Sequence, residues 1–240
     1  MLAYVALHKG AEMFEVPIMD RAEFRRHDPE NRAARPPSLP CRYELRDGHR
    51  VQLDYLGPGD RADLLAGFQG LSQRSRYLRF FSAMPHLPDF IADGLLNTDP
   101  VNHVAVGARL LDDAGNRLPA VVGVARYFRA EGTTTVAEPA IAVGDALHGQ
   151  ALGKCLLRRL SAIARSNGVT HFQAQVLGSN SRMRRLLQAA HATFVDEEDG
   201  VLTYEIDIRK SARPPRGVLA NLLSAMLDPE EIPADRLPAD

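Results

Sequence analysis

Between residues 43 and 209, two patterns of hydrophobic and polar positions follow one another along the chain. Strict alternation is typical of a half-buried strand, and apolar residues three or four positions apart are typical of an amphipathic helix. The alternating stretches predict strands at 51–55, 101–111, 120–129, 134–143, 172–176 and 202–208. The longer period predicts a helix that begins at 58–60, further helical sequence through 79–81 and at 90–96, and two helices at 150–166 and 183–190.

The order of these elements indicates the fold class. A turn of sequence Asp-Asp-Ala-Gly-Asn at 112–116 joins two long strands as a hairpin, and a third strand follows closely. A helix, a strand, a second helix and a last strand complete the pattern up to residue 208. We therefore predict an α/β fold with a mixed, mostly antiparallel central sheet and flanking helices.

The two ends of the chain differ from this central domain. Residues 1–42 end in the proline-rich stretch 35–40, which cannot enter a helix or a central strand, so we interpret them as an N-terminal arm or linker. Residues 210–240 form a C-terminal extension with apolar positions at helical spacing over 218–227 and an acidic end that we expect to be disordered. The predicted helix docks on its own domain or contacts a partner, which leaves a homodimer through the arms open.

Composition and charge exclude several classes of function. The 29 lysines and arginines against 30 acidic residues leave a net charge of −1, so no overall field draws the chain onto nucleic acid or an anionic membrane. Two cysteines, Cys41 and Cys155, exclude a disulfide scaffold and a multi-cysteine zinc site, and we place the second in the core. Without a long apolar run or a basic leader, the chain is expected to be a soluble cytoplasmic protein outside the membrane.

The most informative stretch is a turn from strand to helix at 140–154. An apolar strand runs through a short loop with Gly149 directly into an amphipathic helix that contains Gly153. The first turn of a helix has unpaired N–H groups and a partial positive charge, and glycine lets an anion approach the backbone closely. The stretch predicts a phosphate-binding turn, although a tight connection without a ligand would use the same residues. It matches neither a Walker loop nor a Rossmann fingerprint.

Glu138 is the candidate general base. It lies in the otherwise apolar stretch 136–141, where burial would raise its pKa and suit it to accept a proton near neutrality. The alternative is a surface glutamate on an edge strand. Pro139 cannot donate a hydrogen bond to a neighbouring strand, so this strand is expected to be an edge, or to be bulged or splayed at this point.

Several segments, in order along the chain, resemble one family. Residues 148–153, His-Gly-Gln-Ala-Leu-Gly, are similar to the acyl-CoA signature Gln/Arg-x-x-Gly-x-Gly/Ala of the GNAT N-acetyltransferase superfamily. Segments that resemble its bacterial protein-lysine acetyltransferase branch lie at 75–81, 102–105, 122–127, 137–140 and 176–183. The resemblance covers about residues 43–208 and implies the GNAT fold, in which two central strands part to admit acyl-CoA.

The resemblance implies a site for acetyl-CoA as co-substrate and no metal. The amides of 149–154 would meet the pyrophosphate, backbone groups of the preceding strand would meet the pantetheine arm, and Asn180 would bond near this arm or cap the next helix. The cofactor-binding residues expected on this basis are Ile141, Val143, His148, Gly149, Gln150, Ala151, Leu152, Gly153, Lys154 and Asn180. Glu138 lies where relatives carry their catalytic glutamate.

The sequence departs from the family pattern at three positions. His148 replaces the usual Gln or Arg and loses a long side chain that reaches phosphate, and Ala151 replaces the first motif glycine and leaves slightly less room. Leu187 occupies the position at which many relatives carry a tyrosine that protonates the leaving thiolate. Tyr127, His191 and solvent are the remaining candidates for the acid.

Most basic residues along the predicted helices are expected on solvated faces. Some could bind the 3′-phosphate of CoA, and the best candidates are Lys154, Arg158 and Arg185. A second group could instead guide an acidic protein substrate; its members are Arg74, Arg76 and Arg79.

The resulting prediction is an N-acetyltransferase that moves an acetyl group from acetyl-CoA to a primary amine by direct transfer in a ternary complex. The resemblance indicates a protein lysine as the acceptor. Two alternatives use the same site: an acetyltransferase for a small-molecule amine, and a non-catalytic CoA-binding regulatory module. The second alternative is favoured by the three departures from the family pattern.

Overall fold

The computed structural model describes residues 2–3, 15–16, 38–130, 132–209 and 231–232. Its main element is a nine-stranded sheet in the order β11-β3-β4-β5-β6-β7-β8-β10-β9. These strands are β3 (Cys41–Glu44), β4 (Arg50–Tyr55), β5 (His103–Leu110), β6 (Gly123–Arg129), β7 (Val136–Val143), β8 (His171–Leu177), β9 (Thr193–Glu198), β10 (Val201–Asp207) and β11 (Glu231–Ile232). Two short strands, β1 (Leu2–Ala3) and β2 (Glu15–Val16), pair with each other.

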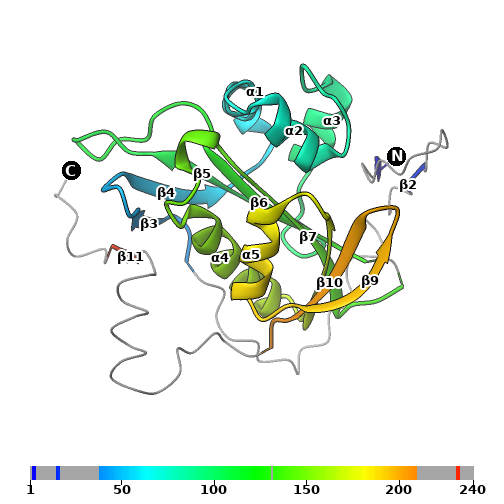
Figure 1. Cartoon of the computed structure of the whole chain (residues 1–240). Helices are drawn as coiled ribbons and strands as arrows, with labels where there is room; N and C mark the ends of the chain where they lie inside the picture. The colour runs from blue at the N-terminus through cyan, green and yellow to red at the C-terminus, as the bar shows by residue number, and fades with distance from the viewer. Residues whose placement is uncertain (1, 4–14, 17–37, 131, 210–230, 233–240) are drawn as a thin grey trace.

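Helices cover both faces of the sheet (Figure 1). They are the 3₁₀ helices η2 (Pro58–Asp60) and η3 (Asp145–Leu147) and the α-helices α1 (Arg61–Gln69), α2 (Gln73–Phe80), α3 (Asp89–Leu96), α4 (Leu152–Ser166) and α5 (Ser181–Ala189). The first three α-helices lie over one face, and α4 and α5 lie over the other (Figure 1). The predicted fold class, a mixed and mostly antiparallel sheet with flanking helices, is therefore confirmed.

Each helical layer has its own apolar core. The predicted stripe of α4 is buried, and Leu152, Leu156 and Leu160 pack against the sheet in the larger core cluster. Cys155 lies in the same cluster with 3% of its surface exposed, so its predicted place in the core is confirmed. The second cluster joins residues of α1, α2 and α3 to the opposite face, with Phe68 and Phe80 in edge-to-face contact. The sheet is thus held rigidly from both sides.

The sheet opens between β7 and β8. These two strands run parallel and pair only at Val136 with His171 and at Ala137 with Phe172, whereas the other neighbouring strands of the described sheet are antiparallel. Pro139 lies two residues beyond the last pair. Of the three placements expected for this proline, splaying is the one observed; the edge-strand alternative is wrong because β7 has a neighbour on each side.

The hydrogen-bond alternation of β7 explains why a proline is tolerated in this central strand. Gly144 donates its N–H to Val122 O at 2.8 Å, beyond the end of the β6–β7 ladder. In an antiparallel pair, every second residue turns its backbone groups toward the partner strand. Given the register of β6 and β7, the backbone groups of Pro139, Ile141 and Val143 therefore face away from β6, toward the opening. The N–H that Pro139 lacks would have had no strand to bond.

The structure adds strands that the hydrophobic pattern did not predict. β3 begins at Cys41, so the boundary placed at residue 43 falls within a strand of the sheet. β9 is exposed along its whole length and shows no alternation of burial that its sequence could reveal. Glu231 and Ile232, in the end expected to be disordered, pair with β3. The apolar stretch 218–227 lies outside the described residues.

Among the described residues, none of the helices has both the length and the apolar character that crossing a bilayer requires. The described residues also bring together no group of three or more histidine, cysteine or acidic side chains that could hold a metal ion.

Candidate active site

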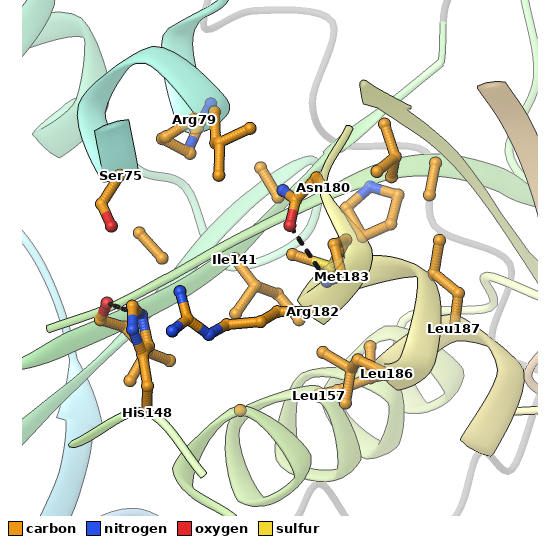
Figure 2. A pocket seen from close by; sticks show the side chains of 18 of the residues that line it. Ser75, Arg79, Ile141, His148, Leu157, Asn180, Arg182, Met183, Leu186 and Leu187 are labelled. Atoms are coloured by element: carbon orange, nitrogen blue, oxygen red, sulfur yellow. Dashed lines mark hydrogen bonds between the residues drawn. The ribbon is translucent and has the colours of Figure 1, made fainter. Parts of the chain in front are cut away.

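The opening between β7 and β8 leads into a cavity of about 580 Å³. Most of its lining comes from α2, the open half of β7, the turn that enters α4, β8 and α5 (Figure 2). Of the residues predicted to bind the co-substrate, Gln150 alone does not line it; the lining includes Ile141, Val143, His148, Gly149, Ala151, Leu152, Gly153, Lys154 and Asn180. Glu138 lines it as well, so the tertiary structure places the candidate base and the predicted phosphate-binding turn on one cavity.

The turn that enters α4 presents several unpaired amides. Gly149 and Ala151 both adopt the left-handed backbone conformation, with φ of 83° and 67°. No hydrogen bond from the N–H of Gly149, Ala151, Leu152 or Gly153 occurs within the described part of the chain. No side chain caps α4 either. Amides left unpaired in such a turn and at a helix start form a concave site for an anion.

Ala151 carries backbone strain that its glycine counterpart in the family pattern would not. It was expected within the helix, but it is the N-cap residue of α4 and has a positive φ. A left-handed conformation costs a residue with a Cβ about 1–2 kcal/mol, partly offset in a glycine variant by a more flexible unfolded chain. We expect Ala151→Gly to stabilise the fold by about 0.5–1 kcal/mol and to raise Tm by about 1–4 °C.

Thermal unfolding measures this effect, and Ala146→Gly serves as the matched control. Ala146 is an exposed residue of η3 and has no positive φ, so the same change should lower Tm there. A lower Tm for both variants would contradict the proposed strain at Ala151.

His148 has a structural role in the turn. Its Nε2 lies 3.0 Å from Val143 O, and its Nδ1 lies 3.8 Å from Asp145 Oδ1. The imidazole therefore ties the turn to the end of β7. Because it occupies the carbonyl of Val143, the backbone N–H of Val143 remains as the group that faces the opening.

Glu138 lies on the face of β7 that is turned toward α2. Ile141 and Val143 pack on the opposite face with the α4 core, and side chains alternate along a strand. Burial raises the pKa of the Glu138 carboxyl above its usual 4.5, and the charge of Arg79 on α2 acts in the opposite direction. Within the described residues, Glu138 makes no hydrogen bond or ion pair. Its carboxylate thus remains available to accept a proton from a ligand in the cavity.

Asp145 joins the turn that enters α4 to the start of α2. Its carboxylate accepts hydrogen bonds from the N–H of Ser72 at 2.8 Å, from the Ser72 hydroxyl at 2.9 Å and from the Ser75 hydroxyl at 2.8 Å. Burial acts to raise the pKa of Asp145, but these hydrogen bonds outweigh it and hold the pKa below its usual value. No motif in the sequence pointed to this contact, because the two segments lie about seventy positions apart.

The candidates for the general acid and for the pantetheine contact differ in their positions relative to the cavity. Asn180 lines the cavity and caps α5, accepting the N–H of Met183 at 3.1 Å (Figure 2). Leu187 also lines the cavity and is buried among apolar groups. Tyr127 is fully buried elsewhere; its hydroxyl donates to Val101 O, and burial raises its pKa to about 12. His191 follows α5 outside the cavity lining, so neither reserve acid is brought to the site.

The basic residues divide differently from what the sequence suggested. Those that line the cavity are Arg46, Arg79, Lys154, Arg182 and Arg185, whereas Arg158 and Arg74 do not. Arg76 is buried and donates to backbone carbonyls, including Leu71 O at 3.0 Å, so it holds the fold together and cannot guide a substrate. Sequence reasoning missed Arg182, which points from α5 across the cavity toward His148 (Figure 2).

Arg182 is therefore expected to contact the phosphates of the ligand. Because its side chain is exposed, the ion pair is screened and contributes no more than about 1 kcal/mol. We expect Arg182→Gln to weaken CoA binding about two- to fivefold. Isothermal titration calorimetry with CoA measures the change, and Arg158→Gln, exposed on α4 outside the lining, should bind like the wild type. Equal affinities for both variants would rule out the contact.

Comparison with known proteins gives consistent results. The sequence model described as the acetyltransferase (GNAT) family matches residues 73–192. A curated protein from Mycolicibacterium smegmatis, named Acetyltransferase Pat, is 30% identical over 173 residues, which cover 70% of this chain and 49% of that protein. The chain thus spans about half the length of this relative.

Solved structures share the fold. The GNAT domain of S. lividans PAT superposes with a TM-score of 0.63 at 28% identity, over 69% of this chain and 95% of that domain. A cAMP-binding acyltransferase from Mycobacterium smegmatis has a TM-score of 0.51 at 24% identity, over 78% of this chain and 53% of its own, and shows the fold alone.

Proposed function

The chain belongs to the GNAT acetyltransferase family, and from this premise we propose that its domain transfers an acetyl group from acetyl-CoA to a primary amine. One observation carries the proposal. The unpaired amides that enter α4 and the carboxylate of Glu138 line the same cavity, at an opening between two strands. The cavity thus combines groups that would bind an anionic, extended co-substrate with a carboxylate that would accept a proton.

The residues present fit acetyl-CoA. The amides of Gly149 and 151–153 would bind its pyrophosphate, and Lys154 and Arg182 add positive charge. The outward-facing backbone of Ile141 would bond to the pantetheine arm as a missing strand would. Acetyl-CoA, when bound, supplies an activated thioester.

Glu138 removes the proton that the amine loses during transfer. The amine nitrogen forms a bond to the thioester carbon, the carbon–sulfur bond breaks, and the thiolate takes a proton from solvent. Among the described residues, those that line the cavity include no tyrosine or cysteine. Cys41 and Cys155 are both buried and outside the lining, which supports direct transfer in a ternary complex over an acylated cysteine.

The acceptor that we propose is a lysine side chain of a protein. The support comes from two relatives, an acetyltransferase Pat and the GNAT domain of a PAT protein, together with the resemblance of segments 75–81 and 176–183 to the bacterial protein-lysine acetyltransferase branch. A small-molecule amine remains the alternative acceptor. Assays with folded proteins, denatured proteins and simple amines, each with acetyl-CoA, distinguish the two by the acceptor-dependent release of CoA.

A second candidate function is a CoA-binding module without turnover. Leu187 favours it, because an apolar side chain lines the cavity where many relatives carry a tyrosine. Acetyl-CoA should raise Tm under either function. Release of free CoA above the rate of spontaneous hydrolysis, in the presence of any acceptor from the panel, supports the enzyme; a Tm rise without such release supports the module.

A further inference from the structure

We infer that a small cavity beside the proposed active site binds the carboxylate of an acidic acyl chain, so that the domain accepts short dicarboxylic acyl-CoA thioesters. This inference rests on the proposed function, because the acyl chain would enter from the main cavity. The small cavity, of about 60 Å³, lies between α1–α3 and strands β6 and β7.

Arg126 is the first support for an anion at this place. It lines the small cavity from β6, and 1% of its surface is exposed. Its Nη2 donates to Leu95 O, whereas its buried Nη1 has no hydrogen-bond partner in the described part of the chain. Buried polar groups without partners are rare and costly, so an unpaired guanidinium N–H indicates a binding partner.

The charge around Arg126 is the second support. Arg79 lines the same small cavity, and the two guanidinium groups repel each other. Burial, and then this repulsion, lower the pKa of Arg126 to about 9, while burial and the charge of Arg126 lower the pKa of His103 to about 4. Apart from the two arginines, the lining is aliphatic, aromatic or glycine. Glu138 offsets one of these two charges, so one positive charge remains for an anion.

The two cavities adjoin, which gives the acyl chain a path. Leu71, Arg79, Phe80 and Ala142 line both. Beyond Glu138, the side chains of β7 that face α2 are the methyl groups of Ala140 and Ala142, since residues alternate between the faces. A chain attached at the thioester could pass over these alanines. The small cavity has the volume of about two water molecules, which suits a carboxylate better than a long tail.

Binding of two four-carbon thioesters to the full chain tests the inference. Succinyl-CoA ends in a carboxylate, and butyryl-CoA ends in a methyl group. By calorimetry, we expect the wild type to bind succinyl-CoA about tenfold more tightly, the low end of what a hydrogen bond to a charged group contributes. Arg126→Met should reduce this ratio to about one. Arg182→Gln, at the phosphate end, should weaken both ligands alike and leave the ratio unchanged.

The possible outcomes separate the two proposals. Equal affinity of the wild type for both thioesters would overturn the inference and leave the proposed function standing, whereas failure to bind acetyl-CoA or CoA at all would overturn the function itself. A third result is that free succinate binds and loses affinity in Arg126→Met while the two thioesters bind equally well. This result would also overturn the inference, because the carboxylate would then not be part of the acyl chain. If Arg126→Met does not fold, Arg79→Met replaces it, because Arg79 is the other arginine that lines the small cavity, and it should likewise reduce the affinity ratio of succinyl-CoA to butyryl-CoA.

Discussion

Replacement of Glu138 by glutamine is expected to reduce kcat for acetyl transfer about 10²- to 10⁴-fold, the usual contribution of a positioned general base. The amide has nearly the shape of the carboxylate but cannot accept the proton. Acetyl-CoA should bind to the variant with unchanged affinity, because the amides of the turn entering α4 are not altered. Release of CoA at saturating acceptor measures the rate, and Glu44→Gln, exposed on β3, is the matched control.

The pH dependence gives an independent check on Glu138. Because burial raises its pKa above the usual 4.5, the ionised base is lost as the pH falls through this raised value. In the wild type, kcat/KM should therefore decrease toward acid with a limb that Glu138→Gln lacks. An identical acid limb in both proteins, or an unchanged kcat, would contradict the role of Glu138 as base.

The stability of Glu138→Gln separates catalysis from folding. A carboxylate whose pKa is raised in the folded state destabilises the fold as the pH rises through and above its ordinary pKa. Glutamine carries no charge, so the variant should be at least as stable as the wild type near pH 7. Loss of activity together with loss of Tm would indicate a structural defect rather than a missing base.

Replacement of Asp145 by alanine is expected to lower the free energy of unfolding by about 1.5–3 kcal/mol. The change removes the carboxylate that accepts three hydrogen bonds from Ser72 and Ser75. Because about a third of the Asp145 side chain is exposed, water can replace part of these hydrogen bonds, which limits the loss of stability. The change also frees the turn that enters α4 from α2, so KM for acetyl-CoA should rise. Chemical denaturation measures the first effect, steady-state kinetics the second, and Asp196→Ala on the exposed strand β9 is the control.

The effect of Asp145 should disappear in acid. Its pKa is held below the ordinary 3.8 in the folded protein, so its contribution to stability is complete above that value and is lost as the pH falls through the lowered pKa. The difference in stability between wild type and Asp145→Asn should therefore shrink as the pH falls below about 4. A difference that grows in acid would contradict this account.

Some features of the site could be predicted from the sequence and others could not. Glu138 and the turn at 148–153 could be singled out because their signals are local, one charge in an apolar strand and glycines at the start of an amphipathic helix, and the resemblance to the GNAT family gave them their expected roles. The left-handed φ of Ala151 could not, because alanine carries no preference for that conformation. Strand β9 was missed because none of its residues is buried.

The hydrophobic periodicities by themselves determined the order of the helices and of most strands, because a periodicity depends on residues only a few positions apart, and the fold class followed from that order. The tertiary structure alone decided which further side chains line the cavity or pack beside it. Arg182 meets the turn through the packing of α5, Asp145 meets α2 across about seventy positions, and Arg126 is buried beside Arg79 by the helices over β6. Such contacts join segments that are distant in the sequence and depend on how the strands pair. A pattern of neighbouring residues does not specify them.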